Sequence, residues 1–430
     1  MFAATVIVVL MVSSQIGFAS TSVTGGDWTQ FINNYQDTRY QSASSVTSSN
    51  VASLKPTWTF LTNNSVTSTP IVYKGVAYFD DWSGYVYAVN VYTGALIWKS
   101  QPGVILSGTP SISNNLLYIA GSGGGKPLIA ALSPSTGQVV WSEILPATME
   151  QDYASPVFYN GNIYLGLGGC AGYGTNSSCK GEMFALNANT GAVVWTYNTG
   201  GSDGGASIWG TVAIDTSSNA IFFGTGYNYA ISTTETYPTV SGGAITPFGK
   251  YGHEYTGTVT SLGSFGLAYS VISLNAATGA LNWADQAYSD KTSAGDVDFG
   301  SSPNLFQVTI NGVQHNAVGI AAKDGNYYVI DRASGALLQK MQVGLPATQG
   351  GGVIGLAGFT NVAPNSPQVF VPGYYGANNT IGCCGVVSEL TPSNGKVVWN
   401  FTTPGKIIGS VAVVPGAVLF GDFYGNLYAL

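Results

Sequence analysis

Tyr85-Val-Tyr-Ala-Val-Asn-Val-Tyr-Thr-Gly-Ala-Leu-Ile-Trp98 is followed in the same chain by Glu182-Met-Phe-Ala-Leu-Asn-Ala-Asn-Thr-Gly-Ala-Val-Val-Trp195 and by Ser270-Val-Ile-Ser-Leu-Asn-Ala-Ala-Thr-Gly-Ala-Leu-Asn-Trp283. Each stretch is typical of a β-strand, a tight turn closed by Gly, and a second strand that ends in Trp. Gly stands in the turn because the turn needs a positive φ. The ending recurs at Trp141 and Trp399, and in weaker form at Gln339, where Gln replaces Trp. The chain is therefore built from an internal repeat.

The spacing of these units indicates the architecture. Two further short strands precede each unit, for example 68–72 and 76–79, so each repeat holds four strands, here named A to D. Trp141 follows Trp98 by 43 residues, and a further Trp, Trp58, precedes Trp98 by 40; both spacings match the roughly 40 to 50 residues of a β-propeller blade. The larger spacings imply loop insertions.

The number of units predicts the number of blades. Six units end at positions 98, 141, 195, 283, 339 and 399, and strands A to C of a seventh follow Trp399. The missing D strand has a candidate at the other end of the chain, in Pro56-Thr-Trp58-Thr-Phe60. We therefore predict an all-β, seven-bladed β-propeller in which this N-terminal strand closes the last blade, because closure removes exposed sheet edges. A truncated eight-bladed ring is the alternative.

Composition excludes several classes of protein. Charged residues make up 8% of the 430 positions, against roughly 25% in ordinary soluble proteins. Disorder needs higher charge and fewer aromatic residues, and a coiled coil needs more Ala, Glu, Lys and Leu. The formal charge of −7 argues against a nucleic-acid partner.

The first 20 residues form a separate segment. Met1 to Val12 is almost wholly apolar, and small residues follow. We expect residues 1–20 to be a secretory signal peptide or a retained N-terminal hydrophobic segment, although no Lys or Arg occurs before Arg39. Residues 21–430 are then one propeller domain, and the protein is extracellular, periplasmic or at the cell surface.

One face of the predicted ring collects the long loops. Strand direction alternates within a blade, so all D–A and B–C connections emerge on the same face. The insertions at 168–181, 227–266 and 373–385 all fall there. Long loops on a rigid scaffold usually carry function, so we expect the functional site on this face.

The repeat Ala-Leu-Asn-Ala-x-Thr-Gly-x-x-x-Trp resembles the tryptophan-docking repeat of the quinoprotein alcohol dehydrogenases, which hold pyrroloquinoline quinone (PQQ). The resemblance runs from Asp27 to the C-terminus. The segment 204–215, with Phe222-Phe-Gly-Thr-Gly226, is similar to the family stretch that forms the floor of the cofactor pocket. Gly295-Asp-Val-Asp-Phe-Gly-Ser-Ser-Pro303 resembles a stretch of the polyvinyl-alcohol-dehydrogenase-like members.

The resemblance implies roles for individual residues. Trp209 matches the Trp on which the quinone ring stacks. Asp298 matches the catalytic base that takes the alcohol proton while a hydride passes to the quinone. Lys323 matches the basic residue at the quinone oxygens, and Lys180 stands where the family has an Arg near the cofactor.

The expected Ca²⁺ site departs from the family pattern. The family binds the ion through a Glu on the blade 3 B–C loop and an Asn or Asp after Gly-Thr-Gly. Here Tyr227 follows Gly226, Asn228 comes one residue late, and no carboxylate occurs between Asp152 and Glu182. Because Ca²⁺ takes six to eight oxygen ligands, we expect weak metal dependence with Asn228 as the remaining ligand. Asp80, Asp81 and Asp422 fall on B–C loops. They either form a different metal site or are independent solvated carboxylates.

Two functions from different classes follow. The first is an exported quinoprotein dehydrogenase that oxidises a small or polymeric alcohol or sugar and passes electrons to an unidentified acceptor. The second is a non-catalytic propeller of the same family that binds cell-surface or extracellular partners, which the missing carboxylates favour.

Four cysteines suit an oxidising compartment. We predict a Cys170–Cys179 disulfide within one loop and an adjacent Cys383–Cys384 disulfide. Cross-pairing between the two loops is the alternative.

Overall fold

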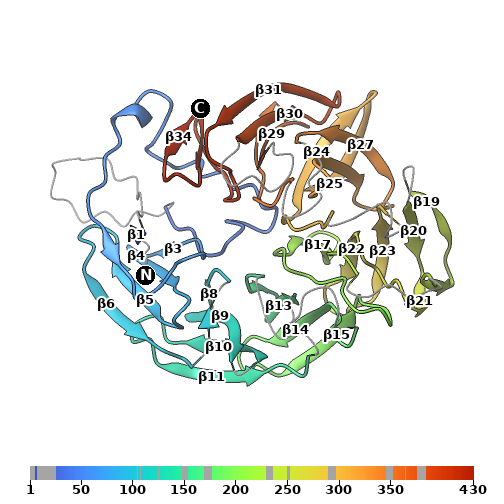
Figure 1. The fold of residues 1–430 in the computed structure, drawn as a ribbon, viewed down its shortest axis with the longest axis horizontal. Helices are drawn as coiled ribbons and strands as arrows, with labels where there is room; N and C mark the ends of the chain where they lie inside the picture. The colour runs from blue at the N-terminus through green and yellow to red at the C-terminus, as the bar shows by residue number, and fades with distance from the viewer. Residues whose placement is uncertain are drawn as a thin grey trace.

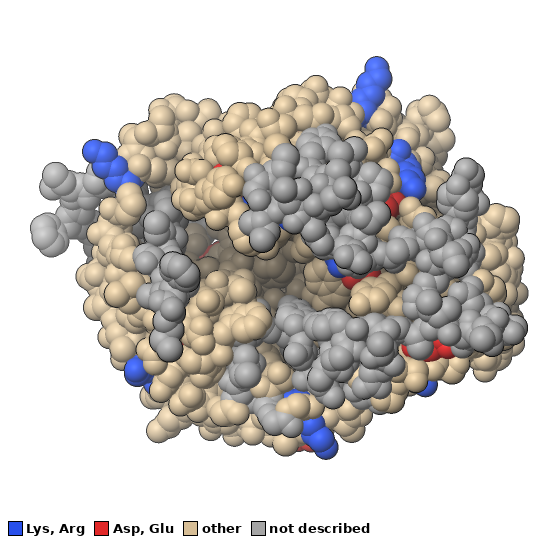
Figure 2. Space-filling view, in the orientation of Figure 1, with Lys and Arg blue, Asp and Glu red and all other residues tan. Residues whose placement is uncertain are grey.

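The computed structural model is a ring of seven β-sheets (Figure 1), and the space-filling view shows a hollow at the centre of the ring that we call the channel (Figure 2). It describes residues 5–6, 26–103, 105–106, 108–123, 125–147, 154–168, 177–228, 236–248, 252–288, 297–344, 352–363, 365–374 and 384–430. The predicted seven-bladed propeller is confirmed, and the eight-bladed alternative is wrong. Within these ranges, no helix has the length and apolar character needed to cross a membrane.

Each blade runs outward from the channel in the order A, B, C, D. Blade 4 has two extra outer strands because the insertion after β17 pairs with the edge of its D strand. Blade 1 consists of β3 (Ile71–Tyr73), β4 (Val76–Asp80), β5 (Val86–Asn90) and β6 (Leu96–Ser100). Blade 2 consists of β8 (Ser111–Ser113), β9 (Leu116–Gly123), β10 (Lys126–Leu132) and β11 (Val139–Ile144), and β7 (Ile105–Leu106) also pairs with β9. Blade 3 consists of β12 (Val157–Tyr159), β13 (Asn162–Leu167), β14 (Glu182–Asn187) and β15 (Val193–Asn198).

The remaining blades follow the same plan. Blade 4 consists of β16 (Ala213–Asp215), β17 (Ala220–Gly224), β22 (Ser270–Asn275), β23 (Leu281–Gln286), β20 (Gly252–Thr256) and β19 (Ile245–Phe248), beside a separate pair of β18 (Thr239–Ser241) and β21 (Thr258–Ser261). Blade 5 consists of β24 (Asn304–Ile310), β25 (Val313–Ala321), β26 (Asn326–Asp331) and β27 (Leu337–Gln342). Blade 6 consists of β28 (Gly358–Ala363), β29 (Ser366–Tyr374), β30 (Gly385–Thr391) and β31 (Lys396–Thr403). Blade 7 consists of β32 (Ala412–Val414), β33 (Ala417–Gly421) and β34 (Leu427–Ala429).

The repeated Trp fastens each blade to the next one. Trp195, for example, donates an indole N–H bond of 3.0 Å to the carbonyl of Ala276 in blade 4. Its ring lies against Gly279, which has a φ of +69° and where a Cβ would stand 2.7 Å from the indole. The Gly of each turn therefore serves both the turn and the docked ring. The same hydrogen bond joins Trp58 to Val91, Trp98 to Pro134, Trp141 to Ala188 and Trp283 to Arg332.

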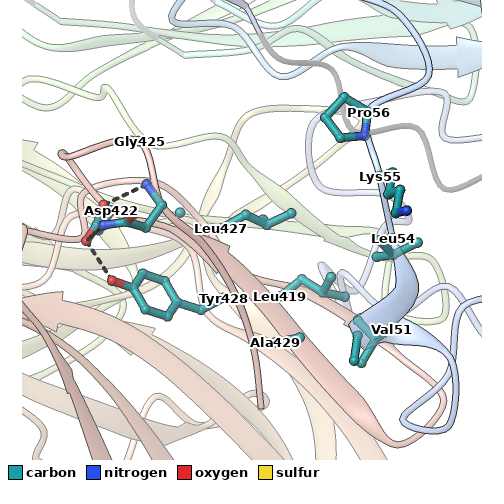
Figure 3. A pocket seen from close by; sticks show the side chains of 13 residues that line it. Val51, Leu54, Lys55, Pro56, Leu419, Asp422, Gly425, Leu427, Tyr428 and Ala429 are labelled. Carbon is teal, nitrogen blue, oxygen red and sulfur yellow. Dashed lines mark hydrogen bonds between the residues drawn. The ribbon is translucent and has the colours of Figure 1, made fainter.

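The N-terminal strand takes its docking position but does not complete blade 7. Trp58 docks on blade 1 as predicted, yet β2 (Phe60–Leu61) pairs with β1 (Thr5–Val6), and in the described part of the chain β34 pairs with β33 alone. A groove of about 720 Å³ lies along β34, with Val51 to Pro56 as its other wall (Figure 3). The predicted pairing is wrong: β2 pairs with β1 instead, and Pro56, which has no N–H, cannot donate a hydrogen bond to a neighbouring strand.

A segment that we call the channel strap, residues 27–41, follows the inner strands around the ring. Trp28 exchanges backbone hydrogen bonds with Val72 of blade 1. Later residues of the strap accept backbone hydrogen bonds from the A strands of five other blades. These bonds of 2.8 to 2.9 Å join Ile112 to Thr29, Ile214 to Tyr35, Leu305 to Gln36, Phe359 to Thr38 and Val413 to Arg39.

A second set of contacts joins neighbouring blades where their A strands begin. In each, a backbone N–H of one blade donates to a Ser or Thr hydroxyl of the next. We call these contacts hydroxyl staples. They run from Thr69 to Thr109 (2.8 Å), Thr109 to Ser155 (3.0 Å), Ser155 to Thr211 (3.1 Å), Thr211 to Ser302 (3.0 Å) and Leu356 to Ser410 (3.1 Å).

Candidate functional site

Trp209 lies in the connection between β15 and β16, at the mouth of the channel. The adjacent backbone is anchored by hydrogen bonds from Ile208 to the carbonyl of Leu167 and from Gly226 to the carbonyl of Ser207. The edge of the indole rests on Gly300, where any Cβ would overlap the ring. Only Gly allows this approach, and the indole is left half-buried.

Asp298 and Lys323 meet beside this indole. Asp298 lies in the connection between β23 and β24, and Lys323 lies in the turn between β25 and β26. The Lys323 ammonium is 3.0 Å from Asp298 Oδ2 and 5.0 Å from the centre of the Trp209 ring. The Lys323 N–H also donates to the Asp298 carbonyl. Both side chains are at least 90% buried, so water screens their attraction less than that of a surface pair.

The other oxygen of Asp298 faces a gap left by glycine. A Cβ at Gly226 would stand 3.3 Å from Asp298 Oδ1 and 2.7 Å from Ser207 Oγ. Gly226 therefore leaves room beside the carboxylate that a side chain would fill. Figure 2 shows a hollow at the centre of this face, with charged atoms of both signs inside it.

An apolar cluster backs the site on one side. Three of its members, Ala206, Tyr227 and Val297, are close neighbours in sequence of Trp209, Gly226 and Asp298. The rest of the cluster comes from the insertion of blade 4 and the end of β23. These members are Phe265, Ala268, Tyr269 and Tyr288. The end of the blade 4 insertion, at Phe265, thus belongs to the same apolar cluster as residues next to the site.

Lys180 and Asn228 lie on segments that adjoin the site residues. Lys180 forms a backbone bridge with Gly205, four residues before Trp209. Asn228 is 1% exposed, and its Oδ1 atom has no hydrogen-bond partner among the residues that the structure describes. The structure thus places Lys323 against both Asp298 and Trp209.

The other candidate residues of the sequence do not form a second site. Asp81 accepts bonds from Tyr87 and from the backbone of Asn63 and Asn64, and Asp422 accepts one from Tyr428. Asp80 and Asp81 are buried, so the expectation of solvated carboxylates is wrong for both. In the described ranges, no three His, Cys, Asp or Glu residues come together as a metal site.

The disulfide predictions fall largely outside the described residues. Cys170 and Cys383 lie in ranges that the structure does not describe, whereas Cys179 is buried among apolar residues of blade 3. The Cys170–Cys179 and Cys383–Cys384 pairings stay predictions.

Sequence reasoning missed three features around the site. The channel strap carries no motif. The hydroxyl staples had a signal, since a Ser or Thr precedes the A strand in most repeats. Asp324, next to Lys323, carries no signal in the sequence, but it is 3% exposed and accepts hydrogen bonds from Tyr288 and Tyr328.

This fold and site define a class, the tryptophan-docked β-propellers with a charged site at one mouth of the channel. Two family models match the chain: that of the glucose/ethanol/alcohol dehydrogenase β-propeller domain over residues 146–349, and that of the outer membrane protein assembly factor BamB over residues 42–241. The chain is thus similar to the PQQ alcohol dehydrogenase-like β-propellers, and each of the two models covers just under half of its length.

Curated relatives show the same similarity. The quinohemoprotein alcohol dehydrogenase ADH-IIG of Pseudomonas putida is 25% identical over 73% of this chain and 45% of its own length. The polyvinylalcohol dehydrogenase of Sphingopyxis sp. (strain 113P3) is 23% identical over 94% of this chain and 65% of its own. The chain spans about half the length of most curated relatives it matches, 45% of the first.

Solved structures share the fold. A europium-containing methanol dehydrogenase superposes with a TM-score of 0.73 at 17% identity, covering 95% of this chain and 84% of its own. The structure of ADH-IIG from Pseudomonas putida superposes with a TM-score of 0.72 at 18% identity, covering 94% and 70%.

Proposed function

We propose that this propeller binds PQQ over Trp209 and oxidises the hydroxyl group of an alcohol or a sugar, with Asp298 as the base. One observation carries the proposal. Lys323 contacts both the carboxylate of Asp298 and the face of Trp209, so the three residue types that this chemistry needs meet at one point.

The residues present fit a planar, anionic quinone. The half-buried indole of Trp209 offers a stacking surface, and Gly300 and Gly226 leave space that larger residues would fill. The Lys323 ammonium is placed to donate to carbonyl or carboxylate oxygens of such a ligand. When bound, PQQ supplies a two-electron acceptor for hydride.

The chain's own residues handle the proton. Asp298 takes the proton of the substrate hydroxyl group as general base. Lys323 donates to Oδ2 and so fixes the orientation of the carboxylate, while Oδ1 faces the gap at Gly226. The apolar cluster around Tyr227 and Val297 limits water on that side.

The residues do not fit a complete Ca²⁺ site. A Ca²⁺ ion takes six to eight oxygens, with carboxylates prominent. The described residues include no group of three or more His, Cys, Asp or Glu, and Asn228 Oδ1 is the unsatisfied oxygen closest in sequence to Gly226. The proposed proton transfer therefore uses no metal ion, and Lys323 supplies the positive charge.

The deficit of metal ligands favours a second candidate, a non-catalytic propeller that binds cell-surface or extracellular partners. One titration separates the two. Purified protein is mixed with PQQ, with and without millimolar Ca²⁺, while tryptophan fluorescence and dye-linked oxidation of alcohols, sugars and polyvinyl alcohol are followed. Trp209→Ala should weaken binding, and Asp298→Asn should abolish turnover while binding remains. If neither quenching nor oxidation occurs with excess PQQ and Ca²⁺, the enzyme proposal is refuted and the scaffold stands.

Export completes the proposal. We propose that residues 1–20 direct the chain out of the cytoplasm, where a separate electron acceptor reoxidises the cofactor. Determining the N-terminus of the mature protein in the culture medium and cell fractions tests this.

A further inference from the structure

We propose that Tyr288 and Asp324 act as a positioning pair that holds Asp298 and Lys323 in register. This inference rests on the proposed function for its meaning, but its test below does not require activity. Tyr288 and Asp324 come from the same two connections as Asp298 and Lys323.

Asp324 is the centre of a buried hydrogen-bond network. Its Oδ2 atom accepts bonds from Tyr288 Oη (2.9 Å), Tyr328 Oη (2.7 Å) and Asn326 Nδ2 (2.8 Å). Its Oδ1 atom accepts the backbone N–H of Asn326 at 3.0 Å. The ammonium of Lys340 lies 3.5 Å from Oδ2. A carboxylate with this many donors is held in one position.

The network ties the two connections together. Tyr288 comes just after β23, at the start of the connection that carries Asp298, and Asp324 lies beside Lys323 in the turn after β25. The Tyr288–Asp324 bond therefore joins the same two segments as the Lys323–Asp298 ion pair. Two links between the segments restrict the relative positions of the Asp298 carboxylate and the Lys323 ammonium more than the ion pair alone would.

Blade 5 departs here from blades 1 and 7. In blades 1 and 7, the first turn residue is Asp81 or Asp422, whose backbone N–H donates to the carbonyl of Tyr85 or Asn426. In blade 5, that position is Ala322, and the carboxylate comes two residues later, at Asp324. Lys323 therefore lies between Ala322 and Asp324, and Asp324 accepts a hydrogen bond from Tyr288 of the preceding connection.

The protonation of the tyrosines suits this role. Burial and the neighbouring carboxylate of Asp324 raise the pKa of Tyr328 far above its usual value. Its hydroxyl group therefore stays protonated and donates at any pH at which the protein functions. Lys340 and Lys323 match the charges of Asp324 and Asp298, so the cluster is balanced overall.

Tyr288→Phe removes the tie without changing charge or shape. We expect the Lys323 amine to react several-fold faster with an acetylating reagent, because its partner segment is less constrained. The assay uses protein without added cofactor, limited acetylation and peptide mass spectrometry, with exposed Lys396 as the internal reference. Asp324→Asn serves as a second variant if Tyr288→Phe folds poorly.

Tyr428→Phe is the matched control. It removes the same hydroxyl-to-carboxylate bond, here to Asp422 in blade 7, where no lysine follows the Asp. It should leave the acetylation of Lys323 unchanged. Unchanged acetylation of Lys323 in both Tyr288→Phe and Asp324→Asn would overturn the proposal, and so would an equal increase in Tyr428→Phe.

Kinetics separate this inference from the proposed function. If the wild-type enzyme oxidises alcohols, Tyr288→Phe should lower kcat about tenfold and leave KM and PQQ binding within about twofold, since positioning acts on the reacting groups. If the wild-type protein does not bind PQQ, the proposed function fails, while faster acetylation in Tyr288→Phe still supports the positioning pair.

Discussion

Arg39 Nε donates a hydrogen bond of 2.6 Å to the carbonyl of Val411, 372 residues further along the chain. The guanidinium group also donates to the carbonyl of Phe31 and lies over the rings of Phe31 and Trp28. It is almost fully buried. A single side chain thus fastens the channel strap to the last blade, beside the place where the ring closes.

Replacing this guanidinium group should destabilise the whole ring. Arg39→Met keeps much of the apolar stem but leaves two buried carbonyl groups without donors and Asp37 without a neighbouring cation. We expect a loss of about 3 kcal/mol in the free energy of unfolding, measured by urea denaturation. Lys396→Met, at an exposed position, is the control. An unchanged urea midpoint for Arg39→Met would show that the strap does not support the ring.

Substitutions at two glycines can separate the stability contributed by the Trp–Gly docking contact from the cost of backbone strain. Gly279 and Gly161 both have positive φ values, of 69° and 80°, but only Gly279 faces a docked Trp. Gly161→Ala should cost about 1 kcal/mol from backbone conformation alone. Gly279→Ala should cost about 2 kcal/mol more, because the methyl group displaces Trp195. Equal losses in thermal or urea unfolding would contradict the docking role.

The hydroxyl staples should each add a measurable amount of stability. Thr109→Val keeps the shape of the side chain and leaves the Thr69 N–H without its acceptor. A lost buried hydrogen bond of this kind costs about 1 to 2 kcal/mol. The exposed Thr258→Val is the comparison variant. If both variants unfold at the wild-type urea concentration, the staples contribute nothing.

Stability should fall as pH rises because of buried carboxyl groups. Burial, with the nearby Glu254 carboxylate, raises the pKa of Asp285 well above its usual value. The folded state therefore keeps a proton that the unfolded state releases near pH 4. Between that pH and the raised pKa, the free energy of unfolding should drop by at most about 1.4 kcal/mol per pH unit from this residue.

Asp285→Asn should flatten this dependence. Asp37 and Asp80 also have pKa values raised well above normal by burial, so the slope should shrink without vanishing. Urea unfolding at several pH values measures the slope, and the exposed Glu143→Gln serves as the control. A slope that is the same in Asp285→Asn and the wild-type protein would refute the assignment.

The predicted Cys170–Cys179 disulfide would close a short loop of blade 3. Such a bond should add roughly 3 kcal/mol at most, through the entropy of the unfolded chain. Non-reducing peptide mapping should recover the two residues in one linked peptide pair that dithiothreitol separates. Recovery of both as thiols, or linked to Cys383 or Cys384, would contradict the prediction.

In the last blade, the repeat pattern predicts the position of Trp58 but not the strand pairing. The Trp repeat predicted that Trp58 docks like the other Trp residues, and it does so on Val91. Its backbone does not pair with β34, because β2 pairs with β1 and a groove separates Val51 to Pro56 from β34. A side-chain pattern predicts a docking position, but strand pairing requires several consecutive extended residues with available N–H groups.

The sequence alone determined the seven-fold repeat and the face on which Trp209, Asp298 and Lys323 lie. These features are local and periodic, so a four-strand unit with a fixed turn dictates where each connection emerges. The tertiary structure alone decided that Lys323 lies 3.0 Å from Asp298, that Asp324 is tied to Tyr288, and that residues 27–41 line the channel. These contacts join segments of unrelated sequence, and the positions of those segments depend on how all seven blades pack. Close packing selects which side chains meet across the ring, and no periodic signal in the sequence encodes it.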